Sequence, residues 1–255
     1  MNSVGCNRSH PPHLLVLVHS APGNLQKRRQ IRATWGSVVQ GSLLFVLGEV
    51  DSGDLQSQLE LENAQYQDLM QGTFRDAYRN MTYKHVTSLK WVHYFCPSAS
   101  YILKTDDDTF INTPALLRIL PNRCLLSRLI LCHLWVRVPV QRKAYKWTVS
   151  RSEFEADVFP NYCSGTAILY SRDAALALYS AAQRTPYFWV DDVHVTGVLA
   201  ASLNLTQLPA RGRMQPIRLS YDETILCSRR APFVFSRHNM SETAMNMLWE
   251  YVLKC

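Results

Sequence analysis

The sequence predicts an α/β protein: a single domain with a mostly parallel central sheet flanked by helices. Two observations lead to this fold class. Short apolar runs alternate with longer helical segments, which is the order of right-handed β-α-β units. The chain also has 255 residues, of which 47% are hydrophobic, and no break in composition divides it. That is enough material for one large core.

Strands and helices alternate through the first half of the chain. The apolar runs are continuous, as in parallel strands that are buried on both faces. Strands are expected at 14–18, 43–47 and 101–104. Helices are expected at 26–35, 55–70 and 80–95.

The second half is less regular. Residues 129–140 fit one or two strands, with Pro139 at an edge or a bend, and 167–170 is a short strand. Helices are expected at 173–183, 193–203 and 242–253. We expect residues 14–255 to form the domain and 1–13 to be a tail or the remnant of a stem.

The net charge of +7 indicates an anionic partner. The basic residues are scattered and form no long Lys/Arg run, so nucleic acid is not favoured. A nucleotide diphosphate fits the positive charge equally well.

Seven cysteines without a C-x-x-C pair argue against zinc-ribbon and thioredoxin-like sites. They suit a lumenal chain with a few long-range disulfides and at least one unpaired thiol. Four N-glycosylation sequons point the same way and begin at Asn7, Asn80, Asn204 and Asn239. The start of the chain does not predict a signal peptide, and no stretch is long enough to span a bilayer. The chain is therefore cytosolic, or an N-terminal anchor lies outside this sequence.

Three consecutive acids, Asp106, Asp107 and Asp108, end the third predicted strand. Ligands of open α/β sheets bind at the carboxyl ends of strands. Clustered carboxylates repel one another unless a positive charge lies between them, and a hard divalent cation that also binds phosphates fits that place. An Asp-rich turn that caps the next element is the alternative.

Two further charged clusters are candidates. Arg28 and Arg32 share a helix face after the first strand, where their guanidinium groups suit a pyrophosphate or a uracil carbonyl. A solvated basic face is the alternative. Asp191 and Asp192 precede a predicted helix, which they would cap, and either acid could also serve as a general base. Cys163 is expected to be structural, although His194 or His238 could be proposed as its base.

Taken in order, these segments resemble the β-1,3-glycosyltransferase family (glycosyltransferase family 31), which includes β-1,3-galactosyl- and β-1,3-N-acetylglucosaminyltransferases. The resemblance covers nearly the whole chain from about residue 14, and its specificity lies in the ordered set rather than in any single motif. The matching segments are Arg28-x-x-x-Arg32-x-Thr34-Trp35-Gly36, Asp76-x-Tyr78-x-Asn80-x-Thr82-x-Lys84, Trp91, Cys96, Lys104-Thr105-Asp106-Asp107-Asp108, Lys146-Trp147, Phe159-Pro160-x-Tyr162-Cys163-Ser164-Gly165-Thr166, Asp191-Asp192-Val193, Cys227, His238 and Trp249.

The resemblance implies a GT-A-type fold, a UDP-sugar donor, a manganese ion and inversion at the anomeric carbon. The three acids match the family's D-x-D motif. The resemblance implies metal binding by Asp108 and His238, and general base catalysis by Asp192. It implies that Asp106 and Asp107 hold the metal–nucleotide assembly or the donor ribose, and that Arg28, Arg32 and Lys84 lie near the nucleotide and its phosphates. An inverting transfer needs such a base, because the acceptor hydroxyl loses its proton as it attacks.

The expected function is transfer of a hexose, galactose in the first place, to the 3-hydroxyl of an acceptor glycan on a glycoprotein or glycolipid. N-acetylglucosamine transfer and a non-catalytic glycan- or UDP-binding relative are the alternatives. The chain departs from the family at 131–134, where a glycine-bearing strand is usual, at Ala167 and at His194. The family also implies the Golgi lumen and, if the full-length chain carries an anchor, a type II membrane protein.

Overall fold

The computed structural model describes residues 6, 11–120, 127–143, 146–210, 234–236 and 238–255. Seven strands form one sheet in the order β3-β2-β1-β4-β6-β5-β7. Their bounds are β1 Leu14–His19, β2 Leu43–Glu49, β3 Leu69–Arg75, β4 Tyr101–Asp106, β5 Leu129–Trp135, β6 Tyr162–Ser171 and β7 Thr206–Pro209. All pairings are parallel except those of β6 with β4 and β5. The predicted fold class is confirmed.

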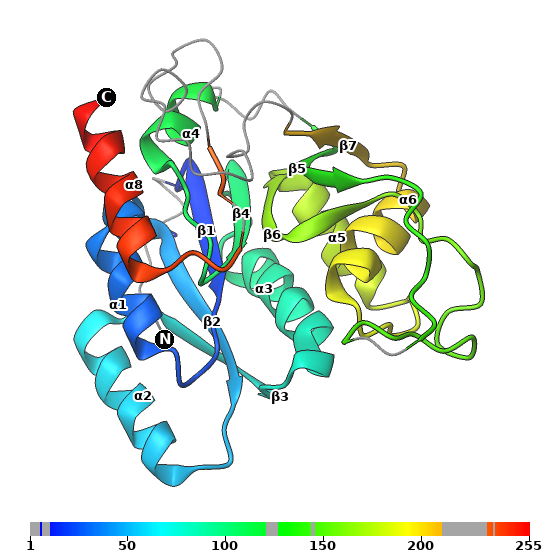
Figure 1. Ribbon diagram of the computed structural model, residues 1–255, viewed down its shortest axis with the longest axis horizontal. Coiled ribbons are helices and arrows are strands. Elements are labelled where there is room, and N and C mark those ends of the chain that lie inside the picture. The colour runs from blue at the N-terminus through cyan, green and yellow to red at the C-terminus, as the bar shows by residue number, and fades with distance from the viewer. Residues whose placement is uncertain (1–5, 7–10, 121–126, 144–145, 211–233, 237) are drawn as a thin grey trace.

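Helices cover both faces of the sheet (Figure 1). They are α1 Leu25–Ala33, α2 Gly53–Tyr66, α3 Met81–Phe95, α4 Thr113–Ile119, α5 Arg172–Ala182, α6 Ala200–Ser202 and α8 Glu242–Lys254. The described residues also form two 3₁₀ segments, η1 Trp35–Ser42 and η2 Tyr78–Asn80, and a π-helical segment, η3 Val193–Leu199.

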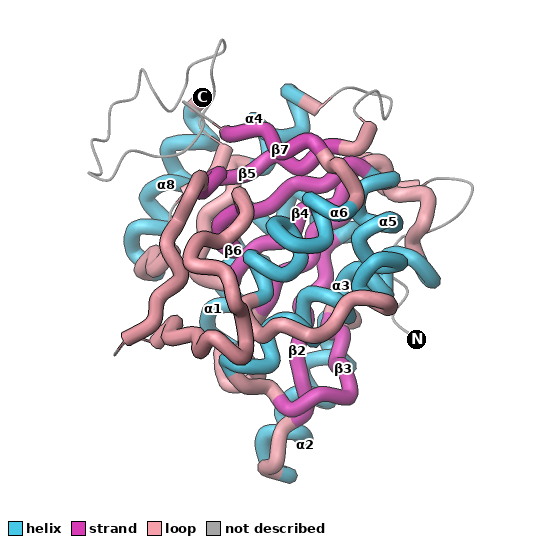
Figure 2. The backbone as a smooth tube through the Cα atoms, turned by 90° about the vertical axis from the view of Figure 1, so that its right-hand side faces the viewer, coloured by secondary structure: helices cyan, strands magenta, loops and turns pink. Residues whose placement is uncertain are grey.

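Alternate residues of β1 enter different cores because successive side chains of a strand point to opposite faces. Val16 packs in a core with residues of α1, α2, α4 and α8, and Leu17 packs in a second core with residues of α3, α5 and η3. Figure 2 shows α5 and α6 in front of the strands on this second face. A third, smaller cluster combines three valines with three aromatic residues and consists of Val140, Val149, Phe159, Phe188, Trp189 and Val193.

The structure corrects several expected elements. The helix expected at 55–70 ends at Tyr66, because Gln67 adopts a left-handed conformation with φ 54°. The following residues form β3, an edge strand whose burial alternates along its length. The strand at 167–170 is longer than expected, and 129–140 contains one strand followed by an isolated bridge at Pro139. Helix α4 and strand β7 were not expected.

Two disulfides join residues far apart in the sequence, as expected. Cys6 pairs with Cys96, and Cys132 pairs with Cys163. The sequon at Asn7 and the cysteines Cys124 and Cys227 lie outside the described residues. Within the described residues, no helix is long and apolar enough to cross a membrane.

Candidate active site

A cleft of about 620 Å³ opens where β4 ends, and four of the predicted site residues line it. Asp106 is the last residue of β4, and Asp108 lies in the turn that follows. Asp192 stands at the start of η3, and His238 comes from the segment before α8. Three distant parts of the chain thus bring both acid clusters to one cleft.

Asp107 points away from this cleft, toward the loop after β1. Its carboxylate accepts hydrogen bonds from the Ser20 hydroxyl at 2.7 Å, the Asn24 amide at 2.8 Å and the Lys27 ammonium at 3.1 Å. Its backbone N–H donates to the His19 carbonyl. The middle acid of the triple therefore fixes the β1–α1 loop against the end of β4.

Asp108 and His238 are brought together by backbone pairing. Ile111 forms an antiparallel bridge with Phe235, and the Met240 N–H donates to the Asp108 carbonyl at 3.0 Å. This pairing holds the segment around His238 beside the turn of Asp108. The Asp108 Oδ1 atom is buried and has no hydrogen-bond partner among the residues that the structure describes.

The donors at this end of the cleft fit a hard cation that is shared with a ligand. The described part of the chain holds no group of three or more His, Cys, Asp or Glu residues that could enclose a metal by itself. Mg²⁺-like sites, however, use one or two carboxylates and complete the shell with waters and substrate phosphates. The unpartnered Asp108 oxygen, in the cleft that His238 also lines, suits that kind of site.

Lys104 is the buried cation between the two acid clusters, and we had not assigned it a role. It lies on β4, and its Nζ donates to Asp106 Oδ1 at 2.7 Å and to the Gly165 carbonyl at 2.5 Å. Burial alone would lower the pKa of Lys104, but the carboxylates of Asp106 and Asp191 raise it. Burial raises the pKa of Asp106 to about 6 against the pull of Lys104. A lysine inside an apolar strand is the signal that could have identified it, because a buried charge needs a partner.

Asp192 both caps η3 and faces the cleft. Its Oδ1 accepts a hydrogen bond from the Val193 N–H at 2.8 Å, and its Oδ2 accepts one from the Gly165 N–H at 3.2 Å. Asp191 Oδ2 lies 3.0 Å from His85 Nδ1 in α3. The two neighbouring acids are thus held by different elements.

These different partners shift the pKa values of the two acids in opposite directions. Burial and the negative charge of Asp191 raise the pKa of Asp192 to about 7. Burial would also raise the pKa of Asp191, but the hydrogen bond from His85 and the charge of Lys104 lower it. His85 is in turn bonded to the Tyr170 hydroxyl at 2.9 Å. Sequence reasoning missed His85, because its partner is 106 residues away.

The predicted nucleotide-binding residue Arg28 does not line the cleft. It is fully buried, and its guanidinium group makes two hydrogen bonds to the Glu62 carboxylate, at 2.8 and 2.7 Å. It also donates to the Ser20 hydroxyl and to the carbonyls of Ala21 and Pro22. Arg28 therefore ties the β1–α1 loop to α2, and the alternative of a solvated basic face is wrong for it.

Arg32 and Lys84 are likewise held by internal carboxylates. Arg32 makes two hydrogen bonds to Asp68, both at 2.8 Å. Lys84 is buried, and its Nζ donates to Asp76 at 2.8 Å and to the Ser20 carbonyl at 2.7 Å. Burial lowers the pKa of Lys84 against the pull of Asp76. Neither side chain lines the cleft. Lys84 contacts the β1–α1 loop directly, and Arg32 is connected to it only through Glu62, which also binds Arg28.

Aromatic side chains form much of the wall on the Asp192 side, and we had not predicted them as site residues. They are Tyr78, Trp135, Trp147, Phe159, Tyr162 and Trp189. Lys146 also lines the cleft, and its Nζ lies 3.9 Å from the centre of the Tyr78 ring. Amphipathic rings with polar edges suit a ligand that has both apolar faces and hydroxyl groups.

Comparison with known proteins identifies the family of the chain. Residues 26–210 match the model of the family described as Galactosyltransferase. A β-1,3-galactosyltransferase 5 of Mus musculus is 35% identical over 204 residues, which cover 78% of this chain and 66% of that protein. A β-1,3-galactosyltransferase 9 of Homo sapiens is 31% identical, with 94% of this chain and 65% of that protein covered.

A third relative has a different donor in its name. The lactosylceramide 1,3-N-acetyl-β-D-glucosaminyltransferase A of Xenopus laevis is 33% identical, and the match covers 75% of this chain and 55% of that protein. The chain thus spans about two thirds or less of the length of these three relatives. A solved structure of the bifunctional glycosyltransferase WbbM matches at a TM-score of 0.45 and 10% identity, over 96% of this chain and 50% of that one.

The match to the family model covers most of the chain, and the named relatives share more than 30% of their aligned residues with it. The chain therefore belongs to the galactosyltransferase family, a family of hexosyltransferases.

Proposed function

We propose that this chain is an inverting β-1,3-glycosyltransferase. It transfers a hexose, galactose in the first place, from a UDP-sugar to the 3-hydroxyl of an acceptor glycan. Asp192 is the general base, and Asp108 and His238 would hold a divalent metal such as Mn²⁺, which would supply positive charge for the pyrophosphate.

One observation carries this proposal: an acid that is outside the candidate metal site, with a pKa raised to about 7, faces the same cleft as that site. A general base works best when its pKa is near the operating pH. The ionised Asp192 accepts the proton of the acceptor hydroxyl as that oxygen attacks the anomeric carbon. The aromatic wall beside it supports placing the acceptor on this side.

The opposite side suits the nucleotide. When bound, the metal would neutralise charge that develops on the leaving UDP. Lys104 adds a buried positive charge next to Asp106 and stabilises negative charge at the end of β4. Arg28, Lys84 and Asp107 all contact the Ser20 loop, so we assign to them the shaping of the nucleotide side. Direct nucleotide contacts of Arg28, Arg32 and Lys84 stay a prediction.

The relatives support galactose as the first donor to test, because two of the three named here are galactosyltransferases. The third is named for N-acetylglucosamine transfer, and that donor is our alternative.

A non-catalytic relative is disfavoured by how the sheet accommodates the departures from the family pattern. Cys132 is bonded to Cys163, and Ala167 is buried and pairs with Thr105 in the sheet. His194 is buried in η3, where burial lowers its pKa to about 4. None of these three side chains lines the cleft.

We place the protein in the lumen of the secretory pathway, with the Golgi as the expected compartment and a type II membrane topology if the full-length chain carries an anchor. The two disulfides support an oxidising compartment. Of the sequon residues, Asn204 and Asn239 are exposed. The proposed partners are the UDP-sugar and a glycan acceptor on a glycoprotein or glycolipid.

The test is a donor panel with a defined linkage readout. The protein is incubated with Mn²⁺, UDP-galactose, UDP-N-acetylglucosamine or UDP-N-acetylgalactosamine, and a set of aryl glycosides that have a free 3-hydroxyl. We expect a β-1,3-linked product, identified by NMR, with UDP-galactose. Absence of turnover with every donor, despite Mn²⁺-dependent UDP binding, would instead support the non-catalytic relative.

A further inference from the structure

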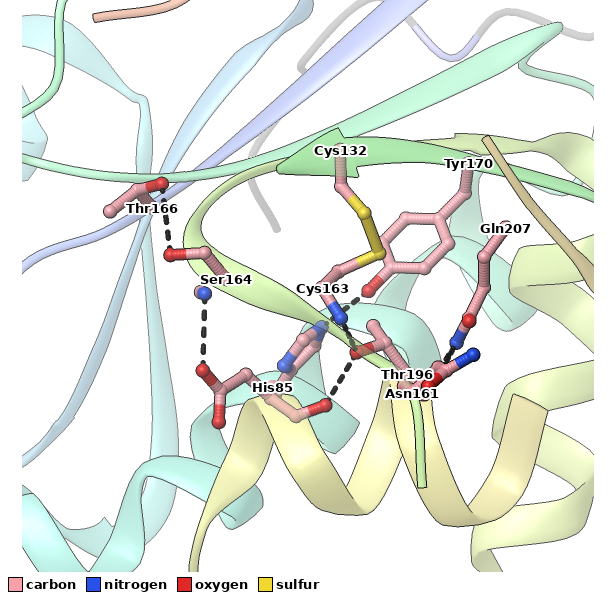
Figure 3. The surroundings of a disulfide bond; sticks show 11 residues. His85, Cys132, Asn161, Cys163, Ser164, Thr166, Tyr170, Thr196 and Gln207 are labelled. Atoms are coloured by element: carbon pink, nitrogen blue, oxygen red, sulfur yellow. Dashed lines mark hydrogen bonds between the residues drawn. A yellow bond between two sulfur atoms is a disulfide. The ribbon is translucent and has the colours of Figure 1, made fainter. Parts of the chain in front are cut away.

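The Cys132–Cys163 disulfide joins β5 to β6 beside the cleft (Figure 3). Both cysteines are fully buried. Between them the strand ladder is irregular: Cys132 pairs with Ile168, but Leu134 already pairs with Cys163. More residues of β6 than of β5 lie between these two pairs, so this part of β6 bulges. Such irregularities are frequent next to active sites.

The bulged residues are the ones that face the cleft. Ser164, Gly165 and Thr166 all line it, and the pairing of β6 with β4 extends only to Ala167. A covalent bond therefore joins the start of the bulge to β5, in addition to the backbone pairing of Cys163 with Leu134. It does so at the residue directly before the segment that contacts the candidate base.

Thr196 connects this segment to the start of η3. The Cys163 N–H donates to Thr196 Oγ1 at 2.9 Å, and the same hydroxyl donates to the Asp192 carbonyl at 2.5 Å. The Thr196 carbonyl accepts a hydrogen bond from the Gln207 amide, which also donates to the Asn161 carbonyl at 2.9 Å (Figure 3). Thr196 is fully buried, and its hydroxyl both accepts and donates a hydrogen bond, which an apolar side chain of the same shape could not do.

Asp192 is thus held at two points by one short stretch of β6. Its backbone is held through Thr196, whose hydroxyl accepts from Cys163. Its carboxylate is held by the Gly165 N–H, two residues further along β6. A shift of this stretch would move both ends of the acid together, and a displacement of about 1 Å is enough to cost a large factor in rate.

We propose that Thr196 and the Cys132–Cys163 disulfide are positioning residues that set the place of the Asp192 carboxylate in the cleft. The inference rests on the proposed function, because it takes Asp192 as the base. The Cys6–Cys96 disulfide has no such connection, since it ties the N-terminal segment to the end of α3.

The first test replaces Thr196 by valine, which keeps the shape and removes the hydroxyl, and by serine, which keeps the hydroxyl. We expect T196V to lower kcat about ten- to a hundredfold with the donor KM and Mn²⁺-dependent UDP binding changed less than about twofold. T196S should recover most of kcat. A T196V enzyme with wild-type kcat, or a T196S enzyme as slow as T196V, would overturn the role of Thr196.

The second test removes each disulfide in turn. The variant C132A/C163A should lose kcat like T196V, whereas the matched control C6A/C96A should keep it. The control bond spans 90 residues against 31, so its removal is expected to lower Tm at least as much. Equal losses of kcat in the two double variants, or none in C132A/C163A, would refute the positioning role of the disulfide.

Asp192→Asn distinguishes a failure of the proposed base from a failure of the positioning role. If D192N turns over as fast as the wild type, the proposed base is wrong and the positioning role falls with it. If D192N is inactive while T196V and C132A/C163A are fully active, Asp192 remains the base, and the positioning role of Thr196 and the disulfide is wrong.

Discussion

The β1–α1 loop and the cleft treat the same residue types in opposite ways. At the β1–α1 loop, charged groups satisfy one another: Asp107 accepts three side-chain hydrogen bonds, and Arg28 donates five. In the cleft, Asp108 has a buried oxygen without a partner in the described structure, and Asp192 is held with a raised pKa. Fully paired charges build the fold, and incompletely paired ones remain available for a ligand or a proton.

The substitution with the largest expected effect on this contrast is Asp192→Asn. The amide keeps the shape of the side chain but cannot accept the proton of the acceptor hydroxyl. We expect turnover to fall about 10³-fold, within the range of general base contributions, while UDP binding measured by calorimetry with Mn²⁺ stays within about twofold. A parallel loss of UDP binding would contradict the separation of the base from the nucleotide-binding site.

Asp108→Asn should affect both binding and rate. It weakens the carboxylate contribution to the metal site, so we expect about 10²-fold lower turnover and weaker Mn²⁺-dependent UDP binding. Chelation of the metal from the wild type should reproduce the defect. Asp107→Asn is the neighbouring comparison, and we expect it to affect stability more than metal dependence, because its carboxylate contacts the Ser20 loop.

Among the fully paired charges near the β1–α1 loop, Glu62→Gln should reduce the stability of the protein and leave its turnover unchanged. It leaves the buried Arg28 without its charged partner, and we expect a loss of about 3 kcal/mol in the free energy of unfolding, measured with denaturant. The matched control is Asp51→Asn, which breaks the exposed ion pair with Arg75 and should change nothing measurable. If Glu62→Gln is as stable as the control, the buried pair of Arg28 and Glu62 does not contribute the stability assigned to it.

The smallest expected effect is on the pH profile. Asp192 must be ionised to act, and its pKa is about 7, so the rate should rise with pH and be about tenfold below its plateau near pH 6. Asp191→Asn removes the neighbouring negative charge, which lowers the pKa of Asp192 and moves this acidic limb to lower pH. A limb that does not move, measured as kcat/KM against pH, would mean that Asp191 does not set the titration.

The local sequence was sufficient for the elements with continuous apolar runs. The runs that became β1, β2 and β4 were predicted because a strand buried on both faces needs apolar residues throughout. Strand β3 was missed because an edge strand is only half buried, and its polar residues resemble the end of the preceding helix. Strand β7 has four residues and no apolar run.

The sequence also determined which acids stand at the ends of elements, since Asp106 ends a recognisable strand and Asp192 directly precedes a predicted helix. It did not reveal that Arg28 pairs with Glu62, or that His85 and Lys104 lower the pKa of Asp191 beside Asp192. Those facts depend on contacts between residues far apart in the chain. Burial and partner charges set whether a side chain is structural or reactive, and both exist only after the chain has folded.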